Sequence, residues 1–154
     1  MTTIIYDHKN SQIACDSQTT ENGIIINSDA DKWYILSDGS LIFATGKTVD
    51  IHELRTHLEG GELSQNIGKV IYFRIHETHK TVIYGSVYET EDKTKVVREE
   101  PLLHSYGIGS GGESALVALS FNVSARDAVI KASEFDINTN DNVKVYDISE
   151  VGFI

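Results

Sequence analysis

The first sixteen residues of the chain restrict its possible folds more than any other stretch. Residues 3–6 and 12–15 are rich in β-branched and other apolar side chains, so they predict two strands. The polar residues 8–11 between them predict a tight turn. Thr2 stands directly before the first strand, where a threonine is also an ordinary way to begin a strand. The rest of the sequence must therefore decide whether Thr2 has a chemical role.

Thr2 gains such a role if Met1 is removed, and we expect its removal because the second residue is small. The hydroxyl of Thr2 and its free α-amine then place a nucleophile and a base in one residue. An α-amine has an ordinary pKa of about 7.7–8.0, so a useful fraction is neutral near neutral pH. A threonine inside the chain would need a separate base.

The composition predicts one soluble domain over residues 1–154. With 13 Lys and Arg against 23 Asp and Glu, the formal net charge is −10, which disfavours binding to nucleic-acid phosphates. Cys15 is the only cysteine, so no intrachain disulfide can form and a reducing compartment fits. We see neither a signal peptide nor an apolar run long enough for a membrane span, and we expect a cytoplasmic protein.

Hydrophobic periodicity beyond the first strands predicts an α+β fold. A short apolar run covers 23–27, hairpins are expected at 33–44 and 70–88, and the charged span 89–100 predicts a solvated ribbon or loop. A helix is expected from Val49 to Leu58, with Val49, Ile51, Leu54 and Leu58 near one face. Two more helices are expected around 115–119 and after a capping box at Ser124–Asp127, where Ala125, Ala128, Val129 and Ala132 share one face. A glycine turn at 107–112 precedes the second helix, and a strand at 143–148 closes the chain.

Five motifs occur in a recognisable order. They are Thr2-Thr3-Ile4-Ile5, Ala14-Cys15-Asp16-Ser17, Asp31-Lys32-Trp33, Ala44-Thr45-Gly46 and Gly109-Ser110-Gly111-Gly112. In this order they resemble proteasome β-type subunits, and above all the HslV-type peptidases of bacteria, over nearly the whole chain. The resemblance implies the four-layer αββα sandwich of N-terminal nucleophile hydrolases. At 154 residues the chain is shorter than usual for that family and resembles compact versions carried by bacteriophages.

Asp16 and Lys32 match the positions of a buried ion pair beside the catalytic threonine in that family. A lysine ammonium there favours the ionised hydroxyl and lowers the pKa of the adjacent amine, and a carboxylate keeps the lysine charged. Without the resemblance, the sequence around Asp16 indicates only an Asx turn, and Lys32 is expected to be an ordinary surface lysine.

Gly46 matches the family glycine whose backbone N–H stabilises the oxyanion. The second glycine of the family motif is replaced by Lys47, which could favour acidic substrate side chains or obstruct the site. The run Gly46-Lys47-Thr48 is not a phosphate-binding loop, because Leu41 stands where that motif needs its first glycine.

Ser110 matches the serine of the family's Gly-Ser-Gly-Gly turn, which lies close to the N-terminal threonine. Asp136 aligns with the family aspartate that precedes the final strand, and Thr139 aligns with its serine. The family's sodium site is not carried over, because the residue types at 141, 144 and 147 differ. His76 and His79 lie in a predicted solvated turn without a third ligand, so we expect no metal and no cofactor.

The resulting prediction is a threonine-type endopeptidase with Thr2, Asp16, Lys32, Gly46, Ser110 and Asp136 in its active site. The resemblance also implies a homo-oligomeric ring, polypeptide substrates and an AAA+ ATPase unfoldase as partner. Two alternatives stay open. One is a catalytically silent structural or regulatory subunit, and the other is an N-terminal nucleophile amidohydrolase that acts on a small amide.

Overall fold

The computed structural model describes residues 2–76, 78 and 80–154, and the chain forms two compact units. The first unit combines the chain up to Lys32 with Leu103–Ile154, and the second is Trp33–Leu102. No helix of the described residues has the length and apolar character that crossing a membrane requires.

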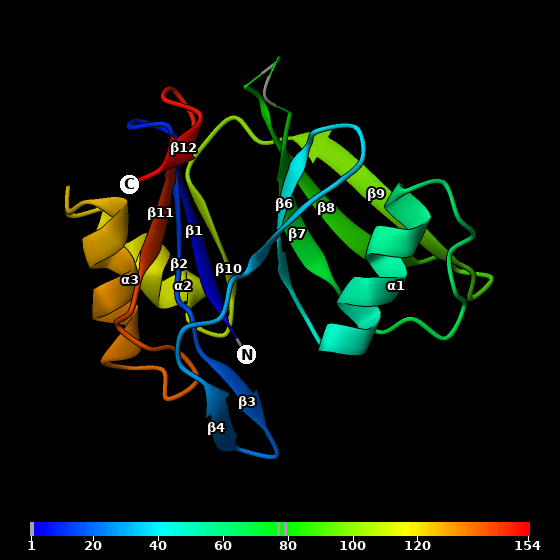
Figure 1. The fold of residues 1–154 in the computed structure, drawn as a ribbon, viewed down its shortest axis with the longest axis horizontal. Helices are drawn as coiled ribbons and strands as arrows, with labels where there is room; N and C mark the ends of the chain where they lie inside the picture. The colour runs from blue at the N-terminus through cyan, green and yellow to red at the C-terminus, as the bar shows by residue number, and fades with distance from the viewer. Residues whose placement is uncertain (1, 77, 79) are drawn as a thin grey trace. The chain divides into compact units, whose positions relative to one another are not determined.

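A five-stranded sheet forms the centre of the first unit (Figure 1). Its order is β10 (Tyr106–Gly109), β1 (Thr3–Asp7), β2 (Gln12–Cys15), β11 (Lys144–Asp147) and β12 (Gly152–Phe153), and every neighbouring pair is antiparallel. All five residues of β1 are buried, because the strand has a partner on each side and helices above it. The two strands predicted at the start of the chain therefore lie in the middle of this sheet.

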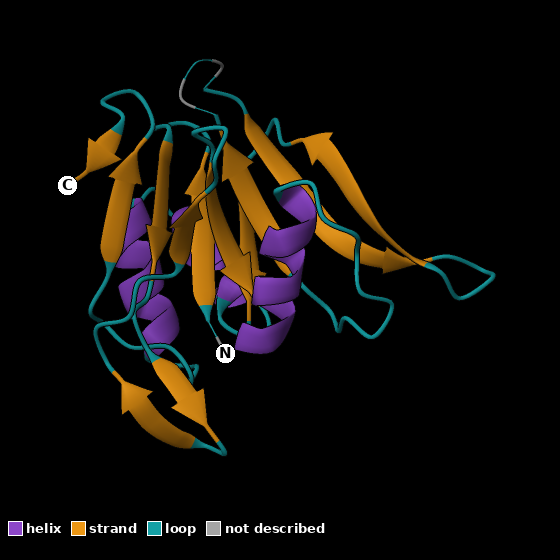
Figure 2. Ribbon diagram, turned by 45° about the vertical axis from the view of Figure 1, so that its right-hand side comes forward, coloured by secondary structure: helices purple, strands orange, loops and turns teal. Residues whose placement is uncertain are grey.

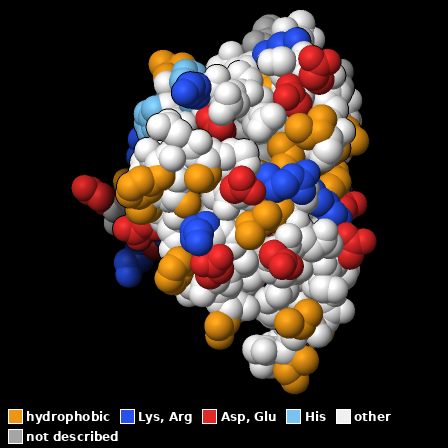
Figure 3. Space-filling view, turned by 90° about the vertical axis from the view of Figure 1, so that its left-hand side faces the viewer, with side chains coloured by type: hydrophobic (Ala, Val, Ile, Leu, Met, Phe, Trp, Pro, Cys, Tyr) orange, Lys and Arg blue, Asp and Glu red, His pale blue; other side chains and the backbone are white. Residues whose placement is uncertain are grey.

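Helices α2 (Gly112–Leu119) and α3 (Ala125–Ser133) cover one face of that sheet (Figure 1). The backbone N–H of Asp127 donates a hydrogen bond to Ser124 Oγ at 3.1 Å, so the predicted N-cap of α3 is confirmed. The predicted small-residue face is also confirmed, since Ala125, Ala128, Val129 and Ala132 are completely buried against the strands. Figure 3 shows this side of the molecule, where apolar side chains are mixed with acidic and basic ones.

A two-stranded ribbon of β3 (Thr19–Glu21) and β4 (Ile24–Asn27) also belongs to the first unit (Figure 2). We predicted the apolar run but missed its partner strand β3. Asn22 and Gly23 have φ values of 52° and 78°, the two left-handed residues of a type I′ hairpin turn. Asn-Gly is a strong hairpin signal, so the ribbon could have been found from the sequence.

The second unit is an antiparallel sheet of five strands in chain order, covered by α1 (Thr48–Leu58). Its strands are β5 (Trp33–Ile35), β6 (Leu41–Thr45), β7 (Ile71–Ile75), β8 (Val82–Glu89) and β9 (Lys95–Pro101). Both predicted hairpins are present. Ile51 and Leu54 of α1 are buried in a core with Ile42 and Tyr72.

Two local predictions need correction, and a third is made more precise. Val49 is 63 % exposed, because α1 begins at Thr48 and turns Ile51 and Leu54 towards the core instead. The solvated ribbon or loop predicted over 89–100 is a ribbon, because β9 forms a long ladder with β8 and most of its residues are exposed. The glycine turn is shorter than predicted, because Gly107 and Gly109 belong to β10 and pair with β1.

Candidate active site

Thr2 lies directly before β1, where the main chain is enclosed by the end of β10. Thr2 is only 4 % exposed, and Thr3 is opposite Gly109 in the antiparallel register. Gly109 has a φ of 89°, and a Cβ at this position would collide with the carbonyl oxygen of Thr2. This close approach therefore requires glycine. Ser110 Oγ lies 3.5 Å from the same carbonyl oxygen.

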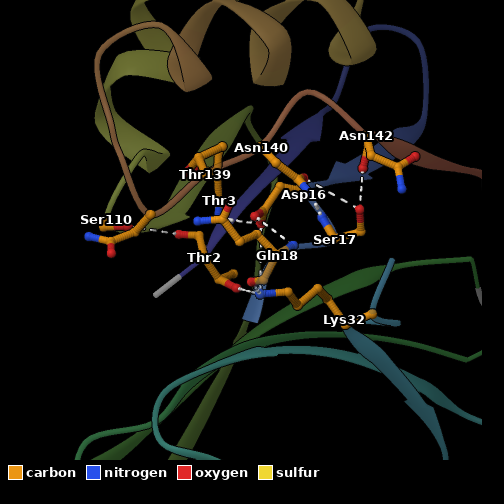
Figure 4. A network of polar contacts seen from close by, with 12 residues as sticks. Thr2, Thr3, Asp16, Ser17, Gln18, Lys32, Ser110, Thr139, Asn140 and Asn142 are labelled. Carbon is orange, nitrogen blue, oxygen red and sulfur yellow. Dashed lines mark hydrogen bonds and ion pairs between the residues drawn. The ribbon is translucent and has the colours of Figure 1, made fainter. Parts of the chain in front are cut away.

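Asp16 follows the last residue of β2 and is completely buried. Its Oδ1 accepts a hydrogen bond from the Thr3 backbone N–H at 3.0 Å, and its Oδ2 accepts one from the Gln18 backbone N–H at 3.2 Å (Figure 4). The backbone N–H of Asp16 in turn donates to the Thr3 carbonyl oxygen at 3.1 Å. Main-chain donors thus fix this carboxylate beside the residue that follows Thr2.

Lys32 reaches the same place from the end of the loop that follows the ribbon. Lysine is rarely buried unless it is paired, yet Lys32 is only 7 % exposed. Its Nζ donates hydrogen bonds to Thr2 Oγ1 and to the Gln18 carbonyl oxygen (Figure 4). It also lies 3.9 Å from Asp16 Oδ1. The structure therefore contains the predicted ion pair, and the amine of Lys32 touches the hydroxyl of Thr2.

Burial is the largest cause of the pKa shifts of Lys32 and Asp16. Loss of solvent lowers the pKa of the Lys32 amine, and the nearby Asp16 and Cys15 oppose this shift. Burial also raises the pKa of the Asp16 carboxyl, against the charge of Lys32 and the backbone hydrogen bonds. Lys32 consequently releases a proton more readily than an exposed lysine does. While it is protonated, its charge favours the ionised form of the hydroxyl that it contacts.

Asp136 gathers a second set of hydrogen bonds. Its Oδ2 accepts from Ser110 Oγ at 2.6 Å and from Thr139 Oγ1 at 2.7 Å, and its Oδ1 accepts from the Asn138 backbone N–H at 3.1 Å. Burial acts to raise the pKa of Asp136, but these hydrogen bonds outweigh it and lower that pKa. The carboxylate therefore stays ionised at neutral pH and holds the Ser110 hydroxyl close to Thr2.

Thr139 connects this set to β1, because its Oγ1 lies 2.6 Å from Thr3 Oγ1 (Figure 4). The single hydroxyl proton of Thr139 is donated to Asp136, so Thr3 is the donor in the hydrogen bond between the two threonines. Thr3 is thus held twice, by its backbone at Asp16 and by its side chain at Thr139. Both networks converge on the residue next to Thr2.

The structure brings five of the six predicted site residues together in the first unit. They are Thr2, Asp16, Lys32, Ser110 and Asp136. Gly46 belongs to the second unit, between the end of β6 and the start of α1. A Cβ at Gly46 would meet the Lys69 carbonyl oxygen at 2.8 Å, so the backbone there also approaches its neighbour closely.

Sequence reasoning missed Thr3, Gln18 and Asn140. The Gln18 carbonyl oxygen accepts from Lys32, and Asn140 Oδ1 accepts from the Ser17 backbone N–H at 3.0 Å. Gln18 stands two residues after Asp16, the spacing of an Asx turn, and this signal could have located it. Nothing in the sequence marks Asn140, because its bond spans 123 residues of chain.

Cys15 and the predicted histidine turn are two further features of chemical interest. Burial raises the pKa of the Cys15 thiol to about 12, as fits a small buried side chain. His76 Nε2 lies 3.2 Å from the Asp38 carbonyl oxygen, whereas His79 and Glu77 of the predicted histidine turn lie outside the described residues, as does Met1. Among the described residues, no group of three or more His, Cys, Asp or Glu side chains could hold a metal ion.

A cavity of about 770 Å³ adjoins the network at Ser110 and extends along α2 and α3. Apolar side chains of Val117, Ala118, Phe121 and Phe135 contribute to its wall. Phe121 and Phe135 are largely exposed. The Ser110 hydroxyl therefore lies where the buried network meets an open, largely apolar surface.

The chain has an HslV-like fold. Its structure is similar to the crystal structure of eukaryotic HslV from Trypanosoma brucei, with a TM-score of 0.66 and 20 % sequence identity over 94 % of this chain and 97 % of that one. No protein-family model and no curated protein matches the sequence. This structural similarity shows the fold of the chain and not its chemistry.

Proposed function

We propose that the protein is a threonine-type endopeptidase subunit whose nucleophile is Thr2 after removal of Met1. One observation carries the proposal, namely that the buried Nζ of Lys32 touches Thr2 Oγ1 beside the buried carboxylate of Asp16. A buried lysine is costly unless it has a specific partner, and here that partner is the hydroxyl next to the chain terminus. The HslV-like fold supports the same assignment.

In the proposed reaction, Thr2 Oγ1 attacks the carbonyl carbon of the substrate peptide bond. The α-amine of Thr2 takes the hydroxyl proton and delivers it to the leaving amine, and an ester joins the acyl group to Thr2. Water then hydrolyses this ester with the same amine as base, which restores the hydroxyl. Lys32 stabilises the developing alkoxide by its contact with Oγ1.

The other site residues orient these groups. Asp16 holds Lys32 and the Thr3 main chain, so it determines where the amine and hydroxyl of Thr2 point. Ser110, held by Asp136, contacts the Thr2 carbonyl oxygen and braces the terminus. The resemblance to the family gives Gly46 the role of oxyanion donor, which is typically worth about 3–4 kcal/mol.

We extend the proposal to architecture and assembly on the strength of the family resemblance and the HslV-like fold. The two sheets and their helices would form a four-layer αββα sandwich. Identical subunits would close into a ring with the active sites inside a chamber. An AAA+ ATPase would supply unfolded polypeptides, and the protein would work in the cytoplasm.

The test measures processing and substrate class together. Intact mass gives the fraction of purified protein that lacks Met1, and hydrolysis is followed for casein, for a fluorogenic peptide and for a small acyl-amide dye. The peptidase proposal expects loss of Met1 and cleavage of casein and peptide. Retention of Met1 on all chains, or cleavage of only the small amide, would contradict it and favour one of the two alternatives.

A further inference from the structure

The loop of residues 28–31 connects the β3–β4 ribbon to Lys32 and has no helix or strand of its own. Such a loop is normally mobile, because few hydrogen bonds oppose its conformational entropy. Nevertheless, it must place Lys32 Nζ against Thr2 Oγ1. The position of the buried amine therefore depends on what fixes this loop.

One end of the loop is fixed by neutral hydrogen bonds. The Ser28 carbonyl oxygen accepts from Ser17 Oγ at 3.0 Å, from Asn140 Nδ2 at 3.0 Å and from Asn142 Nδ2 at 3.1 Å. The Ala30 backbone N–H donates to the Ser17 carbonyl oxygen at 2.8 Å. Asn142 Nδ2 also donates to Asp29 Oδ1 at 3.1 Å. These contacts hold Ser28, the Asp29 side chain and the Ala30 N–H, whereas the backbone carbonyl oxygens of Asp29 and Ala30 bond to another partner.

That partner is the ammonium of Lys144. Its Nζ donates to the backbone carbonyl oxygens of Asp29 and Ala30 at 3.3 and 3.4 Å. It also pairs with the carboxylates of Asp29 at 3.0 Å and Asp31 at 2.9 Å. Four oxygens from three consecutive residues thus surround one amine. Charge-assisted bonds of this kind are stronger than neutral ones.

Lys144 is well placed to act as an anchor. It lies on β11 opposite Cys15 of β2, the residue before Asp16, so it projects from the same rigid sheet that carries the carboxylate. Its side chain is 22 % exposed, whereas Asp29 and Asp31 are 76 % and 62 % exposed. Burial acts to lower the pKa of Lys144, but the bonds and charges of Asp31 and Asp29 outweigh it and raise that pKa. The anchor therefore stays charged at neutral pH.

We propose that Lys144 is a positioning residue that clamps the 28–31 loop to β11 and thereby holds Lys32 at Thr2. The catalytic consequence rests on the proposed peptidase function, whereas the structural consequence for Lys32 does not. Release of the clamp lets the loop move and lets the Lys32 amine leave its buried position.

The first arm of the experiment measures kcat and KM for a fluorogenic peptide. Lys144→Met should lower kcat by roughly ten- to hundredfold with little change in KM, the size expected when a catalytic group shifts by about 1 Å. Lys144→Arg keeps the charge and should retain most of the activity. Lys131→Met is the matched control, because Lys131 also forms a surface ion pair, with Glu134 at 3.0 Å. It should leave kcat unchanged.

The second arm follows the pKa of Lys32 by NMR of ¹³Cε-labelled lysine and does not depend on activity. In the wild type this pKa is lowered by burial, and in Lys144→Met it should rise towards the ordinary value of about 10.4. The double variant Asp29→Asn/Asp31→Asn should shift it in the same direction. A field effect of the lost carboxylates would instead shift it down. The direction of the Lys32 pKa shift in the double aspartate variant therefore separates release of the loop from a simple electrostatic effect.

The outcomes are distinct. An unchanged pKa of Lys32 in Lys144→Met, or a fall in the double aspartate variant, overturns the clamp at any level of activity. If Lys144→Met does not fold, the double aspartate variant decides by the same sign. A wild type without peptide hydrolysis but with the expected pKa shifts refutes the proposed function and supports the clamp. Equal loss of kcat in Lys144→Met and Lys131→Met overturns its catalytic consequence.

Discussion

Lys32 Nζ lies 3.9 Å from Asp16 Oδ1, whereas it donates direct hydrogen bonds to Thr2 Oγ1 and to the Gln18 carbonyl oxygen. The carboxylate has its own close donors in the backbone of Thr3 and Gln18. The two charged groups are thus 3.9 Å apart and do not form a close hydrogen bond with each other. Hydrogen bonds to Thr2, Thr3 and Gln18 fix their positions instead. This division leaves the ammonium directed at the nucleophile rather than at its counter-ion.

Lys32→Met should lower both stability and activity. It leaves the buried Asp16 carboxylate without its counter-charge, which costs about 3–5 kcal/mol in comparable buried pairs. The pKa of Asp16 is already raised by burial, and without Lys32 it should rise further. A raised carboxyl pKa gives stability that is present at low pH and lost as pH rises through the folded pKa. Urea unfolding should therefore show a smaller stability deficit at pH about 5 than at pH about 7.

The double variant Lys32→Met/Asp16→Leu separates stability from catalysis. Without either side chain, no uncompensated charge remains in the buried site, although the Thr3 and Gln18 backbone N–H groups lose their acceptor. The double variant should therefore recover part, but not all, of the stability lost in Lys32→Met. Peptide hydrolysis should not recover, because the group that contacts Thr2 is still missing. Unchanged stability in Lys32→Met would show that Lys32 carries no buried charge coupled to Asp16.

Thr2→Ala should abolish peptide hydrolysis, because it removes the nucleophile. The chain should still fold, with a lower melting temperature, because the buried Lys32 amine loses one hydrogen-bond partner and keeps the Gln18 carbonyl oxygen and Asp16. Thr2→Ser should keep part of the activity, since the amine and a hydroxyl both remain. Single-turnover assays with a fluorogenic peptide, and intact mass to verify removal of Met1 in each variant, make the comparison direct. Turnover by Thr2→Ala at the wild-type rate would rule out Thr2 as nucleophile.

The sequence indicated most of this site through spacing and resemblance, and the structure shows which parts depend on distant contacts. Asp16 and Lys32 could be predicted because each follows a local motif, and both are buried where the family pattern requires. The role of Lys144 could not be predicted, because its partners lie 113–115 residues away along the chain. Only the folded sheet brings β11 next to β2.

The fold was predictable where a pattern was strong. The buried alanine face of α3 and the hairpin around Asp38-Gly39 each have a local physical cause. The strand β3 was missed because Thr19-Thr20-Glu21 is polar and contributes no apolar alternation. Gly107 was assigned to a turn because glycine usually marks turns. In the structure a Cβ there would collide with the Gly112 carbonyl oxygen, so glycine is needed where β10 approaches the start of α2 closely.

Asp136 should make the stability of the protein depend on pH in a defined direction. Hydrogen bonds from Ser110, Thr139 and Asn138 overcome burial and lower its pKa. A lowered carboxyl pKa gives stability that is present above the unfolded value of about 3.9 and is lost as pH falls through the folded pKa. Asp136→Asn should therefore be less stable than the wild type at pH about 7, and the difference should shrink towards pH about 3.

Urea unfolding at several pH values tests this expectation, with Asp141→Asn as control, because Asp141 is exposed. The free energy of unfolding of Asp141→Asn should equal that of the wild type at every pH. A difference between wild type and Asp136→Asn that stays constant with pH would contradict an ionised, hydrogen-bonded Asp136.

Assembly is a separate prediction. The proposed ring should appear as a species several times larger than the 17.1 kDa chain in light scattering at micromolar concentration. Thr2→Ala should assemble as the wild type does, because the Thr2 hydroxyl is buried against Lys32 within the chain. A strictly monomeric wild type would contradict the ring.

The Thr3–Thr139 bond tests how the second network supports the first. Thr3→Val and Thr139→Val keep the side-chain shape, and each removes one hydroxyl from a buried 2.6 Å contact. Each single variant leaves a polar partner unsatisfied, which costs about 1–3 kcal/mol. Thr139→Val should be the more costly, since Asp136 also loses a donor.

In the double variant the losses of stability should be less than additive, because neither hydroxyl then lacks its partner. Thermal unfolding of the three variants measures this coupling, and strictly additive losses would show that the two hydroxyls do not interact.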